Sequence, residues 1–331
     1  MGESFVALPA NQAALMYNPA GLAGLRGMTV SYSRKEMNWV SLTDDWSLKA
    51  FNAAVATPFG VFAAQYNRLF MGTHPVTTIQ NPDGAGSEAT IYSHDAALGF
   101  GTTLGRGVSV GVAAKYYDFV ENFSGEMEGT VPTTPAYLFD FGITYTLPRF
   151  HAQTAIEDSV TVGTSFQNVG TSWKVKGAPA NQSYSELPEY FRMGFSFAMR
   201  IVPGEKEDLT IFSSVLTAEF RSLQAHATPP VESSYWGIGL ECTIFDFVSL
   251  RGGAAFRPLT TFEAEHDRAA FRYGAGLRLP LGRIGVDFPL AFSLQYAVIP
   301  LNQLEYYDLS SSVRSSVSAF SLDIQYTGAP W

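Results

Sequence analysis

The amino-acid sequence predicts an all-β protein, a transmembrane antiparallel up-and-down β-barrel of about 14 strands with a small N-terminal plug in its lumen. Three observations predict it: a period-two alternation of apolar and polar residues, connections that alternate between long and short, and an unusual composition. Charged residues make up 15% and aromatic residues 14% of the chain, whereas about 25% of a typical soluble domain is charged. No stretch approaches the roughly 20 uninterrupted apolar residues of a membrane-spanning helix.

The alternation is clearest between Ile284 and Val298, where even positions are apolar or aromatic and odd positions are mostly small or polar. Successive side chains of a strand point to opposite faces of a sheet, so this segment has one apolar and one polar face. The same pattern recurs in 139–147, 191–200 and 271–279. A soluble β-sandwich also alternates, so this signal alone does not separate the two classes.

The lengths of the connections separate a barrel from a sandwich. Odd-numbered connections are long and polar, and even-numbered ones are short. Long outer loops and tight periplasmic turns are typical of a transmembrane barrel, whereas the crossovers of a sandwich impose no such order. An even strand count places both chain ends on the periplasmic side of a bacterial outer membrane. The expected strands are 27–38, 47–57, 60–69, 90–104, 107–120, 136–148, 158–168, 188–201, 208–221, 234–244, 247–258, 268–280, 284–298 and 313–326.

Charged residues fall mainly on the polar face of the expected strands. A charge facing lipid at mid-depth costs about 2–4 kcal/mol, so the lumen is where these side chains belong. Many other positions on this face are Gly or Ala, which leaves room for a plug in a barrel too wide for its own side chains to fill. The expected lumen charge cluster is Arg192, Arg200, Arg251, Arg272, Arg278, Asp140, Asp287 and Asp323, with Arg257 and Glu241 on the same face.

The segment before the first strand, residues 1–26, is the candidate plug, and residues 27–331 form the barrel. The candidate plug is rich in small residues and carries only Glu3 and Arg26 as charged side chains. Asn18 and Pro19 fix a turn, and Gly21 after Ala20 permits a strained backbone. The alternative is a disordered periplasmic extension.

Other functional classes lack their residues in this sequence. The net charge of −9 and the absence of a basic cluster argue against a nucleic-acid partner. The five histidines lie singly, without metal-ligand spacing, and no nucleophile, base and orienting residue form a known motif, so we expect neither an enzyme nor a cofactor. The single Cys242 excludes an intrachain disulfide. No signal peptide is visible, and we expect that the numbering begins after its removal.

Three motifs resemble the FadL/PorV superfamily of outer-membrane barrels. Residues 1–7 and 13–23, the latter ending in Asn-Pro-Ala-Gly-Leu-Ala, are similar to the family's opening, although Glu3 and Ser4 replace a usual Gly and its neighbour. Residues 187–194 resemble the entry to the family's eighth strand, and 247–253 resemble its eleventh. The resemblance implies that the N-terminal segment is a hatch that blocks the pore.

Two functions follow from this resemblance. The first is a PorV-like, partner-binding subunit of a type IX-like protein secretion and surface-attachment machinery. Such a subunit contacts outer-membrane lipid or lipopolysaccharide, and binds envelope or secreted proteins through its loops or wall. The alternative is a FadL-like transporter of hydrophobic small molecules such as fatty acids. The compact, polar outer loops favour the first function.

Overall fold

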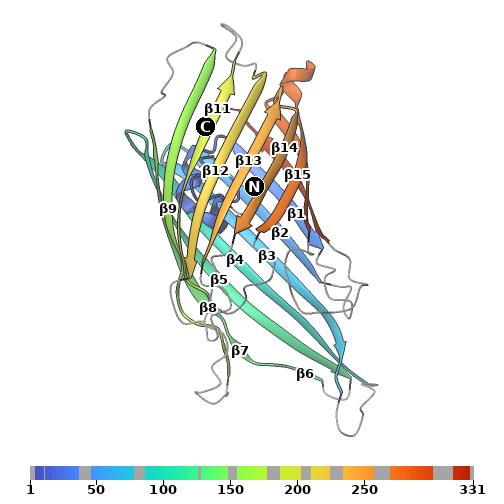
Figure 1. Ribbon diagram of the computed structural model, residues 1–331. Coiled ribbons are helices and arrows are strands. Elements are labelled where there is room, and N and C mark those ends of the chain that lie inside the picture. The colour runs from blue at the N-terminus through green and yellow to red at the C-terminus, as the bar shows by residue number, and fades with distance from the viewer. Residues whose placement is uncertain are drawn as a thin grey trace.

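The computed structural model describes residues 4–10, 12–36, 46–77, 86–125, 128–147, 155–176, 187–202, 210–223, 234–256, 269–300 and 316–328. Within these residues fourteen antiparallel strands form a closed barrel in which the first strand pairs with the last (Figure 1). No helix in this part of the chain is long and apolar enough to cross a membrane. The barrel strands are β1 (Met28–Glu36), β2 (Ser47–Thr57), β3 (Gly60–Pro75), β4 (Ser87–Gly105), β5 (Val108–Gly125), β8 (Ala136–Thr146), β9 (Ile156–Gly170), β11 (Tyr190–Ile201), β12 (Phe212–Leu223), β13 (Ser234–Ile244), β14 (Val248–Phe256), β15 (Ala269–Pro280), β16 (Leu290–Pro300) and β17 (Ser316–Tyr326).

The predicted fold class, an antiparallel barrel of 14 strands, is confirmed. The remaining elements are short. Before the barrel come α1 (Ala14–Tyr17) and η1 (Pro19–Gly24), and η3 (Leu281–Ile284) connects β15 to β16. Beyond the wall, β6 (Gly129–Thr130) pairs with β5, and β7 (Thr133–Thr134) pairs with β10 (Lys174–Val175).

The predicted strand 284–298 begins six residues later than expected, at Leu290. The chain first makes the turn η3, which ends at Gly285 with a left-handed φ of +89°. Pro289 then precedes the strand, as is usual for a residue that lacks the backbone donor of a sheet. The alternation from 284 to 288 is therefore not a strand. Asp287 lies in this connection and is exposed, so it is not on the inner face of a strand as expected.

The outside of the barrel is a belt of exposed apolar side chains. On β8, Tyr137, Phe139, Phe141 and Ile143 are each between 44% and 56% exposed, while Asp140 between them is fully buried on the inside. Phe195 of β11 and Leu277 of β15 are likewise exposed on the outer face. A closed antiparallel barrel with apolar residues outside and polar residues inside is the architecture of an outer-membrane β-barrel.

Three neighbouring strands are longer than a membrane requires. β3, β4 and β5 contain 16, 19 and 18 residues, and 19 residues of strand extend about 63 Å. The apolar band of such barrels is only about 25 Å tall. These strands therefore project past the rest of the wall, at the end where β6 and β7 lie (Figure 1). We call this end, which carries the longer connections, the long-loop end.

The described N-terminal segment, residues 4–10 and 12–26, lies inside the ring of strands (Figure 1). Leu15, Leu22 and Leu25 of this segment are buried against the inner wall. Their neighbours there are small apolar side chains on β2, β3, β4 and β5, namely Ala54, Val61, Ala63, Ala97 and Ala113.

The alternation of faces predicts a large asymmetry between two arginine substitutions on β16. Leu294→Arg places a charge on the lipid-facing side and should lower the free energy of unfolding by about 2–4 kcal/mol. Ala297→Arg places the same side chain on the polar inner side and should cost much less. Urea unfolding in lipid vesicles measures both. Equal losses would mean that the register of β16 is wrong, because a shift of one residue exchanges the two faces.

Candidate functional site

A row of three glycines on the inner wall lies beneath the N-terminal segment. Gly101 of β4, Gly111 of β5 and Gly142 of β8 are direct partners in neighbouring strands. A Cβ added at Gly101 would lie 2.8 Å from the carbonyl oxygen of Pro19, and one added at Gly111 or Gly142 would overlap Pro19 or Asn18. This glycine row is therefore a trough without side chains, and η1 fills it.

Asn18 holds the turn together and fastens it to the wall. Its buried side-chain oxygen accepts a hydrogen bond from the Ala20 N–H at 3.0 Å, which caps η1. Its amide nitrogen donates to the Val6 carbonyl at 2.7 Å and lies 3.3 Å from the carbonyl oxygens of Ile143 and Thr164. One side chain thus joins both halves of the segment to β8 and β9.

The other residues of the predicted motif lie beside Asn18. Pro19 occupies the first position of η1, where its fixed φ suits a helical turn. Gly21 is buried so closely that an added Cβ would lie 2.8 Å from the Leu8 carbonyl oxygen. The structure therefore places Asn18, Pro19, Ala20 and Gly21 together on the inner wall, and their role in closing the pore stays a prediction.

The carboxylate of Glu219 on β12 holds the start of the segment. One oxygen accepts hydrogen bonds from the backbone N–H groups of Phe5 and Val6, at 2.7 and 2.9 Å. The other oxygen accepts from the Arg192 guanidinium at 2.6 Å. Both charged side chains are buried, and a buried ion pair is tolerated only when its remaining hydrogen-bonding groups are satisfied. The N-terminal segment supplies those partners for Glu219.

The contacts of Arg192 continue along the wall to a second part of the segment. Its Nε donates to the side-chain oxygen of Gln167 at 2.6 Å, and the amide nitrogen of Gln167 donates to the Met16 carbonyl at 2.8 Å. The Tyr17 ring lies 5.0 Å from the guanidinium. Arg192 therefore connects the two ends of the segment through the wall.

A β-bulge provides the next link. Asn168 has a left-handed φ of +61°, and the β8–β9 pairing shifts register there. Bulges of this kind re-aim side chains next to functional sites. Asp140, opposite the bulge, accepts the Asn168 N–H at 2.8 Å and forms an ion pair with Lys115 at 2.5 Å. We call the whole chain of contacts the latch network, comprising Lys115, Asp140, Gln167, Asn168, Arg192 and Glu219.

The predicted lumen charge cluster is divided in the structure. Of its eight residues, Arg192 and Asp140 belong to the latch network. Arg251 and Asp323 belong to a second group, on β14 and β17, because Gln295 accepts from Arg251 at 2.5 Å and donates to Asp323 at 2.7 Å. Glu241 pairs with Arg251 there.

The other predicted charges lie apart from these two groups. Arg278 donates to Gln325 at 3.0 Å, and Arg200 donates to Thr210 at 2.6 Å. Arg272 of β15 lies opposite a glycine of β14. Asp287 lies in the connection before β16, as described above, and Arg257 lies outside the described residues. A single cluster is therefore the wrong description of these residues.

The sequence reasoning missed Glu219, Gln167 and Lys115. A signal for Glu219 does exist, because it is the only charged residue between Phe212 and Phe220 and falls on the inward face of the strand. Gln167 and Lys115 carry no comparable signal, since inward polar residues are common in such barrels.

A tryptophan from a connection packs against the inner wall at the long-loop end. Trp173, from the connection after β9, is buried against Ala136 and Leu138 on the inner face of β8. Its ring meets the Phe119 ring edge-on, with centroids 5.3 Å apart. Part of the predicted outer loop 169–187 thus folds inward and makes an apolar cluster at the mouth.

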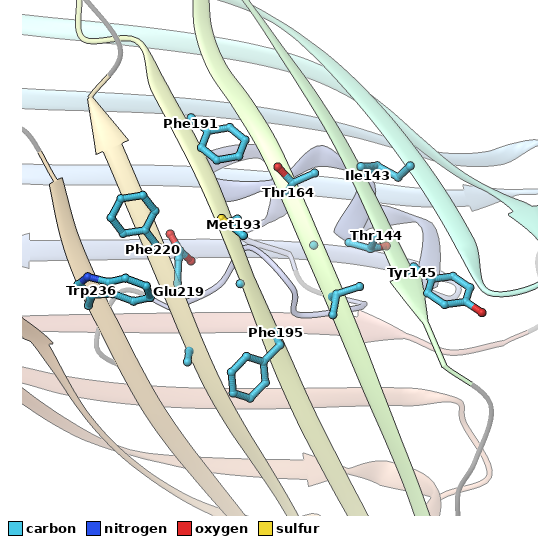
Figure 2. A pocket seen from close by; sticks show the side chains of 14 residues that line it. Ile143, Thr144, Tyr145, Thr164, Phe191, Met193, Phe195, Glu219, Phe220 and Trp236 are labelled. Carbon is cyan, nitrogen blue, oxygen red and sulfur yellow. The ribbon is translucent and has the colours of Figure 1, made fainter.

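The outer wall of the same strands carries an apolar groove of about 610 Å³ (Figure 2). Its sides are formed by outward-pointing side chains of β8, β9, β11, β12 and β13, including Phe195, Phe220 and Trp236. The backbone of Gly163 and Gly194 lies at its floor, and Val6 packs against both glycines from the inside. The groove and the N-terminal segment therefore lie back to back on one wall.

Comparison with known proteins identifies a fold but no sequence family. No protein-family model matches the chain, and no curated protein does. The CymD monoaromatic hydrocarbon channel superposes with a TM-score of 0.53 at 10% identity, over 98% of this chain and 95% of that one. The fold is that of an outer-membrane β-barrel similar to CymD. A Pseudomonas aeruginosa FadL homologue (TM-score 0.46, 12% identity, 98% and 96% covered) and the Pseudomonas putida toluene transporter TodX (0.44, 8%, 98% and 95%) are also similar.

The glycine row gives a test of how the N-terminal segment is held. Gly142→Leu should displace η1, because the new side chain would occupy the place of Asn18. The test uses Ala20→Cys in a Cys242→Ser background. With Gly142→Leu added, this cysteine should react with a water-soluble maleimide at least about tenfold faster than without it. A tenfold change corresponds to a loss of about 1.4 kcal/mol in the free energy that holds the segment on the wall. Gly252→Leu is the matched control, since its Cβ would meet open space. If Ala20→Cys stays protected in Gly142→Leu, the row does not seat the segment.

Proposed function

We propose that this protein is an outer-membrane channel for small hydrophobic molecules, closed by residues 1–26 as a hatch within a barrel of residues 27–331. The observation that carries the proposal is the apolar strip of inner wall that the segment covers. That strip consists of Ala54, Val61, Ala63, Ala97 and Ala113, in contact with three leucines of the segment.

The strip favours an apolar cargo for an energetic reason. Moving the hatch exposes Leu15, Leu22 and Leu25, and each buried leucine contributes about 1.5–3 kcal/mol relative to exposure. A hydrophobic molecule can replace the lost contacts along the alanines, whereas a sugar or an ion cannot. The latch network, which consists of hydrogen bonds and ion pairs, holds the hatch while no cargo is present.

Two further features support this function over the alternatives. Trp173 and its neighbours form an apolar cluster at the mouth, where a hydrophobic molecule would enter. CymD, whose fold is similar, is described as a monoaromatic hydrocarbon channel. The proposal is for passage without chemical conversion. In it the long-loop end faces the cell exterior and both chain termini are periplasmic.

A second candidate function, PorV-like partner binding in a type IX-like secretion machinery, is favoured by one observation. The long strands β3, β4 and β5 project beyond the wall, and such an extension offers an edge for a secreted or envelope protein. This role needs no movement of the hatch. Uptake of a hydrophobic dye therefore separates the two functions.

Deleting residues 1–25 tests the hatch and the cargo together. In a planar bilayer the intact protein should conduct few ions, and the deleted protein should show a steady aqueous conductance, because a barrel of this width leaves room for water once emptied. Cells that carry the deleted protein should also take up the neutral dye N-phenylnaphthylamine faster. If the deletion raises the conductance but not the dye uptake, the segment is a hatch but the cargo is not hydrophobic. If it changes neither, both parts of the proposed function are wrong.

A milder change should give an intermediate result. Replacing Asn18 and Pro19 with Ala removes the cap and the preset turn but keeps the bulk of the segment, so the channel should open intermittently. The matched control replaces Gln12 and Pro9 with Ala, an amide and a proline at less buried positions of the same segment. Identical single-channel records from the two double variants would show that the turn does not set the closed state.

A further inference from the structure

The outer-wall groove runs between two rows of side chains that follow the pairing direction of the sheet. Strand pairing aligns residues of the first row as direct partners across five strands, and does the same for the second row across four. Figure 2 shows the two rows with the groove between them. The first row is Ile143, Thr164, Met193, Phe220 and Trp236, and the second is Tyr145, Val162, Phe195 and Ala218.

The dimensions of the groove follow from sheet geometry. Four steps between neighbouring strands give a length of about 19 Å. The two rows are two residues apart along each strand, so their Cβ atoms are separated by about 6.7 Å. The groove is therefore long and narrow, and its volume of about 610 Å³ leaves room for one hydrocarbon chain.

The groove opens to the membrane and is closed towards the lumen. Its floor is the backbone of the intervening row, which contains Gly163 and Gly194. The pairing of β9 with β11 runs without interruption from Ile156 with Ile201 to Gln167 with Tyr190. The pairing of β11 with β12 is also continuous. Molecules in the groove therefore come from the bilayer, where acyl chains are the surrounding medium.

The lining presents no charge to an occupant. Glu219 is the only charged residue among the described lining residues, and both of its carboxylate oxygens are engaged on the inner side by the segment and by Arg192. The Thr164 hydroxyl donates to the Arg192 carbonyl at 3.0 Å. An uncharged, flexible chain fits this lining, whereas a charged headgroup does not.

We propose that the groove binds one acyl chain of a membrane lipid. Association within a bilayer gains nothing from the expulsion of water, so it depends on van der Waals contact. A chain lying between two rows touches side chains on both flanks and backbone beneath, which is more contact than a convex wall provides. The Phe220 and Trp236 rings, with centroids 4.8 Å apart, form one end of the groove.

Bound lipid should therefore survive purification in a mild detergent. Native mass spectrometry of the parent protein should show one retained phospholipid per barrel. Ala218→Phe fills the groove from within its second row and should abolish this retention. Ala275→Phe, an outward substitution of the same type on β15, should not. The proposal is overturned if the parent retains no lipid or if all three proteins retain it equally. It is also overturned if a small neutral hydrocarbon is retained in place of the lipid.

Fluorescence quenching measures the same site within a bilayer. A variant that keeps Trp236 as its sole tryptophan is reconstituted with phospholipids that carry brominated acyl chains. Quenching should be half-complete at a several-fold lower mole fraction of brominated lipid than for a sole tryptophan at Leu277, which lies on β15, two strands from β13 and outside the groove. Ala218→Phe should bring the two curves together. Coincident curves in the unmodified groove would contradict an acyl-chain site. This inference is independent of the proposed transport, because a closed channel would bind the lipid equally well.

Discussion

The contact between Glu219 and the backbone of Phe5 and Val6 is the constraint on which the lumen depends. Glu219 and Arg192 are both buried, and a hydrogen bond to a charged group contributes about 1.5–3 kcal/mol. Because the N-terminal segment provides two of those partners, the segment and the wall stabilise each other. The latch network extends this dependence across five strands, from Lys115 on β5 to Glu219 on β12. Moving the segment therefore changes the wall, and moving these strands changes the segment.

Glycine at specific inner-wall positions makes this arrangement possible. The glycine row seats η1, while Gly163 and Gly194 allow Val6 to reach the wall itself. The same two glycines form the floor of the outer groove, so the N-terminal segment and the proposed lipid site are separated only by backbone. The rest of the inner wall, around Arg251 and Asp323, carries its own polar network. The segment consequently covers an apolar strip of the inner wall and leaves a polar side uncovered.

The fold could be predicted from the sequence because the barrel strands follow a local rule, the alternation of faces, and most connections follow the long–short order. The alternation rule failed at 284–288. The apolar–polar alternation continues there in the sequence, but Gly285 and Pro289 interrupt the strand. The site was predicted only in part. Asn18 and Pro19 predict a turn by residue type, but the partners of Asn18 in β8 and β9 lie more than a hundred residues away in the sequence. The bulge at Asn168 brings its backbone N–H to Asp140. A bulge leaves no period-two pattern in the sequence, so the latch network could not be predicted before the strands were paired.

In the proposed channel, the N-terminal segment must leave the wall of β11 and β12 before a molecule can pass. A disulfide between Ala7→Cys and Ser196→Cys, in a Cys242→Ser background, tests it directly, because the Ser196 hydroxyl already donates to the Ala7 carbonyl at 2.8 Å. Uptake of N-phenylnaphthylamine is measured in cells before and after reduction. The oxidised protein should take up no dye above background, and reduction should restore uptake. Equal uptake with the disulfide intact and reduced would contradict it.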